Sequence, residues 1–403
     1  MQRVIEACVE GNTERLTSLV DSAVNPRQLV NKREEQGFTA LHIAVMMGAA
    51  GCARKLLDVG ADPKARTPEG ATPIVMAAQG TGQPGAPELQ EGGAAKCVQF
   101  LLDAGADQTE RDEVVGTVPM HTAIYSGRLG VFKTLLAGPG GEVAVNTKDT
   151  QGATPLHIAC RAKGAAGPVA AMTLLEEGCP VVVDFSVRDD SGRTPLYDAV
   201  HHGHAEVVKL LLAAGSDPSL QDSTGLSPLG ATAWLGKEAC LDAILGTESG
   251  LATLELANNL GATPLIFACQ ENNESIAQKL IAAGASLDAK DLTGQTPYII
   301  AKAQKASACV KLLTEEHGRP SREEESFNFA ASSMITNLGG GTLMGMSGGG
   351  VNISTTKDKE TDGDVHVSMT KDKKTGHMSI SMSTEKETKS GGTGTAAAPA
   401  PES

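Results

Sequence analysis

An eight-residue pattern that recurs along most of the chain limits the folds open to it. Its clearest copy is GATPLHIA at residues 152–159, and eight copies begin at positions 37, 70, 116, 152, 192, 225, 261 and 294. Three of the seven intervals are 33 residues long, so the longer intervals contain insertions. Self-similarity at a fixed period is typical of repeat architectures, in which each unit stacks on its neighbours.

Each copy predicts a pair of helices. The glycine of the octet permits a tight turn, the threonine caps the first helix through its hydroxyl, and the proline follows at the first helical position, where its missing N–H costs nothing. An apolar end of a second helix lies 20 residues after the glycine in most copies, at Leu57, Leu136, Leu212, Leu245 and Ile281. A single pair cannot bury its own apolar face, so the pairs must stack into a solenoid.

The octet and its period closely resemble those of the ankyrin-repeat family, whose signature is T-P-L-H-x-A. The resemblance covers residues 1–317 and implies an α fold, a solenoid of helix pairs joined by β-turn fingers. Residues 1–36 contain two segments with helical spacing and are predicted to form an N-terminal capping repeat. Residues 37–317 hold the eight repeats, and the last of them has a lysine-bearing second helix that suits a polar cap.

Two repeats depart from the pattern. The second carries a Gly/Pro-rich insertion at about residues 80–95, which we expect to form an exposed loop away from the fingers. The fourth has a longer finger with a strand-like apolar run at residues 181–187.

The period stops near residue 317, and the remaining chain has a different composition. Residues 318–350 read as a Gly-rich linker, and residues 351–403 as a low-complexity Ser/Thr/Lys-rich tail with three short repeats, VNISTTKDK, VHVSMTKDK and MSISMSTEK. Each repeat alternates apolar and polar residues and then gives a charged turn. Two interpretations stay open: a disordered tail with weak strand preference, or a three-stranded meander that could mediate self-association.

Charge and cysteine usage narrow the function classes. A formal net charge of −14 opposes binding to nucleic acid or anionic membranes and favours a protein partner with a basic surface. The start of the chain lacks the apolar run of a signal peptide, and no stretch approaches the roughly 18 apolar residues of a membrane span. Eight cysteines occur without a CxxC pair, which predicts reduced, buried thiols. We expect a cytoplasmic protein, with the nucleus as the alternative.

The sequence offers little for catalysis or metal binding. His201, His202 and His204 cluster, but no cysteine or carboxylate recurs beside them at ligand spacing, so we predict no metal site. No phosphate loop and no set of nucleophile, base and orienting acid is present, so we predict no cofactor and no enzyme. The resemblance gives the octet histidines a structural role in tying neighbouring turns together; these are His42, His121 and His157.

In the ankyrin family, variable positions near the octet line a concave face that grips partners, and they carry over to two sets of residues here. The set at the ends of the first helices comprises Met46, Met47, Gln79, Tyr125, Ser126, Arg161, His201, His202, Trp234, Leu235, Gln270 and Glu271. The set in the fingers comprises Phe38, Val114, Val115, Leu226, Leu260 and Leu292. Large apolar groups at positions that need no burial are typical of binding hot spots. Alternatively, Trp234 and Leu235 pack against the adjacent repeat.

These features favour a protein-interaction scaffold or adaptor that binds its partner through the concave face. One alternative is a self-assembling protein driven by the tail, which carries the solenoid as a passenger. Another is an acidic inhibitor that masks a basic surface of a regulatory protein.

Overall fold

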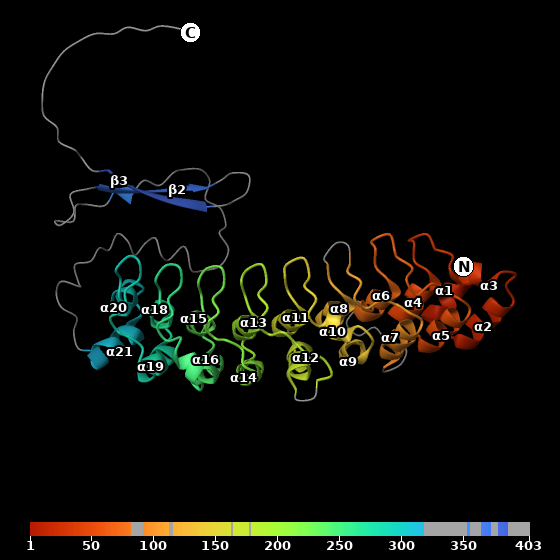
Figure 1. The fold of residues 1–403 in the computed structure, drawn as a ribbon, viewed down its shortest axis with the longest axis horizontal. Helices are drawn as coiled ribbons and strands as arrows, with labels where there is room; N and C mark the ends of the chain where they lie inside the picture. Colours follow the sequence, from red (N-terminus) through yellow and green to blue (C-terminus); the bar gives the residue numbers. More distant parts are fainter. Residues whose placement is uncertain are drawn as a thin grey trace, which may run out of the picture. The chain divides into compact units, whose positions relative to one another are not determined.

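The computed structural model describes residues 1–81, 92–112, 116–162, 164–176 and 179–317, and three further strand segments of which only the backbone is described. Its contacts divide the chain into two units, Met1–Met334 and Ile335–Ser403. Every element of the described part of the first unit is a helix, and Figure 1 shows these helices as successive pairs in a row. The α solenoid predicted from the octets is therefore confirmed.

The octets start the first helix of each pair, and all but the first of these helices begin at the octet proline. They are α4 (Ala40–Met46), α6 (Pro73–Gln79), α8 (Pro119–Tyr125), α11 (Pro155–Arg161), α13 (Pro195–His202), α15 (Pro228–Leu235), α18 (Pro264–Gln270) and α20 (Pro297–Ala303). Capping by the octet hydroxyl is only partly as predicted. Thr194 and Thr296 accept a bond from the backbone N–H three residues on, whereas Thr72 and Thr263 do not.

A second helix packs against each first helix and completes the repeat. These helices are α5 (Ala50–Asp58), α7 (Gly93–Asp103), α9 (Leu129–Ala137), α12 (Ala166–Leu175), α14 (Ala205–Ala213), α16 (Glu238–Leu245), α19 (Glu274–Ala282) and α21 (Ser307–His317). Short helices follow two of them, α10 (Gly141–Ala144) and α17 (Glu248–Leu251). Before the first octet, α1 (Gln2–Val9) and α2 (Thr13–Asp21) pack against α4 and α5, and α3 (Pro26–Val30) follows.

The core lies between successive pairs rather than inside any one of them. The fifth residue of the octet is at most 1% exposed in seven copies, at Leu41, Ile74, Met120, Leu156, Leu196, Leu229 and Leu265. Aromatic rings contribute little, since Tyr197 and Phe132 are the rings among the largest fully buried side chains of the described residues. Burial by neighbours means that each repeat depends on the next for its stability.

The fingers between pairs are joined through their backbones. The N–H of Asp190 donates to the Gln151 carbonyl at 2.9 Å, and the N–H of Leu292 donates to the Leu260 carbonyl at the same distance. Gly225 sits at one such junction with φ of +77°, and a Cβ there would come within 2.6 Å of the Asn259 nitrogen. This close approach explains why the octet begins with glycine at that junction.

The long finger of the fourth repeat differs from its prediction. Residues 181–187 form no strand, and Asn146 of the preceding repeat fixes their backbone instead. Its Nδ2 donates to the Val182 carbonyl at 2.8 Å, and its Oδ1 accepts from the Asp184 N–H at 2.9 Å. Val181, Val183 and Phe185 pack against the core, whereas Val182 is 86% exposed, so the run alternates as a strand would although it pairs with no strand. Most of the predicted insertion loop, residues 82–91, lies outside the described residues.

The second unit contains an antiparallel sheet in the order β1–β2–β3. Its strands are β1 (Ile353–Ser354), β2 (Asp364–Lys371) and β3 (Met378–Glu385). The register pairs Ile353 with Val367 and Val367 with Met382. Each strand lies in one of the three short repeats of the tail, as the meander interpretation predicts. The rest of the tail is outside the described residues.

Leu156→Asp should destabilise the solenoid severely. Leu156 has no exposed surface, so the substitution places a carboxylate without a partner between two repeats, at a cost on the order of several kcal/mol. Val182→Asp, at an exposed apolar position, is the control and should stay within about 0.5 kcal/mol of wild type. Urea unfolding followed by circular dichroism measures both, and an unchanged midpoint for Leu156→Asp would contradict the assigned register.

Candidate protein-binding face

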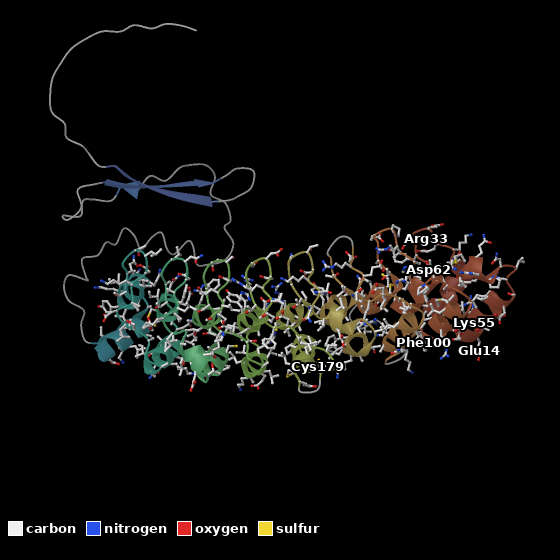
Figure 2. All side chains as sticks on the ribbon, in the orientation of Figure 1. Glu14, Arg33, Lys55, Asp62, Phe100 and Cys179 are labelled. Carbon is white, nitrogen blue, oxygen red and sulfur yellow. The ribbon has the colours of Figure 1, made fainter. Side chains whose placement is uncertain are left out.

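The candidate surface is the first-helix face, which we define as the fingers together with the carboxyl-terminal ends of the first helices. Figure 1 shows the fingers along the edge of the row on the side of the first helices. Figure 2 shows Arg33 on this side, whereas Lys55, Phe100 and Cys179 lie towards the second helices. Backbone bonds between fingers hold the face in register, so its side chains are presented on a rigid frame.

Several predicted residues are exposed on the first-helix face. Tyr125 ends α8 and is 82% exposed, although the residue before it, Ile124, is only 1% exposed. Gln79 is also exposed at the end of α6. On the fingers, Leu260 is 45% and Leu292 77% exposed, and the backbone bond between them makes the two leucines neighbours.

Other predicted residues lie partly or fully in the core. Phe38, Met46 and Trp234 are half-buried and pack against buried residues, so the packing alternative for Trp234 holds in part. Leu226 is only 6% exposed, and its prediction as a contact residue is therefore wrong. Its side chain fills the space above Gly230, the sixth residue of the octet. The other seven octets have a residue with a side chain at this position. The remaining residues divide into Met47, Leu235 and Gln270, which are half-buried, Ser126 and Glu271, which are exposed, and Val114 and Val115, which lie outside the described residues.

An ion-pair cluster joins the fourth and fifth repeats on this face. Arg161, at the end of α11, donates from Nε to Asp198 Oδ2 at 2.7 Å and from its terminal nitrogen to Asp189. The side chain of Asp198 is 1% exposed, and that of Asp189 is 6% exposed. Arg161 thus offsets the cost of burying two carboxylates by bonding to both.

The family resemblance pointed to Arg161 but to neither aspartate. A signal for Asp198 was present, because it is the sole charged residue at the seventh position of any octet. Burial raises the pKa of Asp198 to about 7, against the opposing effect of the Arg161 guanidinium. No comparable signal marked Asp189, which belongs to a finger turn.

The cluster borders an open cleft of about 460 Å³. The cleft is lined by Gln151, Arg161, Asp189, Asp190, Ser191, Arg193, Asp198, His201 and His202. His202 donates from Nδ1 to the Asp198 carbonyl at 3.0 Å, and the His201 and His202 rings lie 4.9 Å apart. Two buried nitrogens of these lining residues, Arg193 Nε and His201 Nδ1, make no hydrogen bond within the described part of the chain. A ligand group placed in the cleft could satisfy them.

The octet histidines connect successive repeats, as predicted. In His157, Nδ1 accepts from the Thr154 N–H at 3.2 Å, and Nε2 lies 3.1 Å from the Arg193 carbonyl of the next repeat. Because Nδ1 is an acceptor, the ring proton is assigned to Nε2, which donates to that carbonyl. His42 and His121 make equivalent bonds to the Ala65 and Ala153 carbonyls. Burial lowers the pKa of all three rings.

Within the described residues, no three or more histidine, cysteine or acidic side chains are grouped in a way that could hold a metal ion. Among the same residues, no helix has the length and apolar character needed to cross a membrane.

A family profile described as ankyrin repeats in three copies matches residues 4–112, 89–181, 120–222 and 229–323, which is well over half of the chain. The chain belongs to the ankyrin-repeat family. Ankyrin repeats generally mediate protein–protein interaction, and the repeats of this chain share this general function.

Curated proteins from several organisms show the same similarity. A mouse protein named B-cell lymphoma 3 protein homolog is 31% identical over 175 residues, which are 43% of this chain and 38% of that protein. The Neurospora crassa ankyrin repeat protein nuc-2 is 30% identical over 228 residues, 54% of this chain and 19% of the relative. A Drosophila melanogaster cation channel, transient receptor potential subfamily A member 1, is 27% identical over 231 residues, 57% of this chain and 17% of the channel. The match thus spans less than two fifths of each relative.

The buried octet histidines should make the stability of the solenoid depend on pH. Burial lowers the pKa of His157 from its ordinary 6.5 to about 4, so the unfolded chain binds a proton more readily than the folded one between these values. The stability that the neutral ring contributes is present above pH 6.5 and is lost as the pH falls towards 4. His157→Gln should remove part of this slope, a difference on the order of a few kcal/mol across the window. Urea unfolding of both proteins at a series of pH values measures it, and parallel curves would show that the ring does not titrate this way.

Proposed function

We propose that this chain is a non-catalytic scaffold or adaptor that holds a protein partner on the first-helix face, without a cofactor. Tyr125 is the observation that carries the proposal. It stands 82% exposed at the end of a helix, directly after the buried Ala123 and Ile124, so a large ring is held in water by a rigid frame. Exposed aromatic groups of this kind are typical of binding hot spots, because a partner that covers them gains their burial.

Two further features support the same face. Leu260 and Leu292 place an apolar pair on adjacent fingers, and the cleft beside Asp198 contains buried nitrogens that lack partners among the described residues. The cleft therefore suits a polar side chain of the partner, while the leucines suit an apolar one. The net charge of −14 favours a partner with a basic surface, and masking such a surface is one form that the function could take.

The proposed organisation keeps the divisions inferred from the sequence. The cap covers residues 1–36, the repeats 37–317, the linker 318–350 and the tail 351–403. We place the protein in the cytoplasm, with the nucleus as the alternative, on the basis of its acidic charge and its family.

A test compares variants of the full-length chain against a partner isolated by affinity capture on the wild type. Tyr125→Ala should weaken binding by roughly 1 to 3 kcal/mol in calorimetric titration, because the partner loses the ring that it covers. Trp234→Ala should weaken binding as well, but it should also lower the melting temperature, since that ring is half-buried against the core. Leu251→Ala is the control: this leucine is 41% exposed but lies in α17, away from the first-helix face. Wild-type binding by Tyr125→Ala would remove the main support for the proposal.

Self-assembly through the tail is the second candidate, and the sheet favours it. β2 and β3 pair over eight residues each, while the far edge of β3 has no partner strand among the described segments. An unpaired edge can add a strand from another chain.

The two candidates differ in how they respond to removal of the tail. Under the scaffold proposal, residues 1–317 should keep the oligomeric state of the full-length chain, its partner affinity and its melting temperature, because each repeat contacts only its neighbours. Sizing chromatography with light scattering, calorimetric titration and thermal melting measure these properties. An oligomer that becomes a monomer on truncation, with native melting retained, would favour the tail; loss of partner binding would contradict the assignment to the first-helix face.

A further inference from the structure

Two pairs of cysteines occupy equivalent positions near the two ends of the row of helices. Cys8 in α1 faces Cys52 in α5, and Cys269 in α18 faces Cys309 in α21. In each pair, the second cysteine lies 15 residues after the octet glycine of its own repeat, and the first lies on the preceding first helix. All four side chains are fully buried.

The contacts of the two pairs are the same. The Cys52 thiol donates to the Ala7 carbonyl at 3.8 Å, and the Cys309 thiol donates to the Ala268 carbonyl at 3.8 Å. Ala7 and Ala268 each immediately precede the other cysteine of their pair. Each second-helix thiol therefore points at the backbone beside its partner, in a core that holds the two helices together.

The two thiols of each pair interact with each other through their side chains. A hydrogen bond with the Cys8 thiol lowers the pKa of Cys52 to about 7, with help from the Thr13 hydroxyl, while the same interaction and burial raise the pKa of Cys8. The hydrogen bond with Cys269 likewise lowers the pKa of Cys309 and raises that of Cys269. Two thiols held side by side in this way are a pair that an oxidant can join as a disulfide.

Two other buried cysteines, Cys160 and Cys240, lack this arrangement, while Cys97 interacts with Cys52 electrostatically but not by a hydrogen bond. Burial raises the pKa of Cys240 to about 11, and burial raises the pKa of Cys160 as well. No cysteine contributes to either shift. Small buried thiols thus occur throughout the solenoid as packing groups, and the two pairs stand apart from them by their contacts.

We propose that Cys8–Cys52 and Cys269–Cys309 are two disulfide-forming pairs that a hydroperoxide oxidises. Once deprotonated, the Cys52 sulfur attacks one peroxide oxygen, which breaks the O–O bond, gives a sulfenic acid and releases hydroxide. The Cys8 sulfur then attacks the sulfenic sulfur, forms the S–S bond and loses its proton, and water leaves. Two thiols and one hydrogen peroxide become one disulfide and two waters. Cys309 and Cys269 take the corresponding roles.

The position of the two cysteine pairs determines how an oxidant reaches them and what a disulfide there would change. Among the described residues, the first and last helix pairs are covered by a neighbouring repeat on one side, so they open locally more readily than central repeats, and this opening admits the oxidant. A disulfide would then join α1 to α5 and α18 to α21, and would close chain loops from residue 8 to 52 and from 269 to 309. Oxidation would restrict the opening of both ends and leave the central part of the first-helix face unchanged.

The test uses the full-length protein treated with hydrogen peroxide, then alkylated in denaturant without reductant, digested and analysed by mass spectrometry. We expect cross-linked peptides that contain Cys8 with Cys52 and Cys269 with Cys309, both lost after reduction, while Cys160 and Cys240 remain alkylated. Cys179 is half-buried and belongs to neither pair. Its oxidation, without a cross-link to any of the four paired cysteines, shows that the peroxide treatment was effective.

Variants and hydrogen exchange complete the test. Cys52→Ala should lose only the first cross-link and Cys309→Ala only the second, whereas Cys240→Ala should keep both. In the oxidised wild type, amide exchange in α1 and α5 should slow severalfold and recover on reduction. The proposal is overturned if Cys8 and Cys52 stay alkylated after Cys179 is oxidised, if they reach sulfinic acid without cross-linking, or if Cys52 joins Cys97 of the next second helix instead.

Discussion

Burial of each apolar helix face by the next repeat is the interaction on which the rest of this structure depends. Leu156 and its counterparts in the other octets are removed from water only because a neighbouring pair covers them. The polar connections follow the same direction. His157 donates a hydrogen bond to the backbone of the next repeat, and adjacent fingers are joined by backbone hydrogen bonds. Apolar stacking sets the distance between repeats, and these bonds fix their register.

A regular frame of this kind decides what the first-helix face can present. The end of each first helix falls at a fixed place, so a side chain there is either covered by the next repeat or left in water. Tyr125 is left in water, Trp234 is half covered, and Arg161 reaches into the next repeat to bond with Asp198. The same face therefore combines candidate contacts with groups that stabilise the stack, and a binding variant must be checked for stability before its affinity is interpreted.

Nearest-neighbour stability also separates the ends of the solenoid from its centre. Among the described residues, the first and last helix pairs each have one neighbouring pair. Near these ends, one cysteine of each proposed pair lies in a first helix and the other in the second helix of the next repeat. A covalent bond between those helices would supply a connection where apolar stacking is least complete. The central repeats, which include Tyr125 and the cleft, are covered on both sides and need no such connection.

The sequence by itself determined the repeat and the helix starts at the octet prolines. Its family resemblance implied the linking role of the octet histidines, and the tail stayed open between a disordered segment and three strands. The repeat and the helix starts depend on local conformational preferences and on a period that is visible in one dimension. Only the tertiary structure decided that Leu226 is buried, that residues 181–187 are held by Asn146 rather than in a strand, and that Arg161 bonds to two aspartates. It also brought Cys8 to Cys52, 44 positions along the chain. Each of these outcomes depends on which side chains meet in three dimensions, and for Arg161, Asn146 and the cysteines the contact lies in another repeat. The local pattern of one repeat does not specify such contacts.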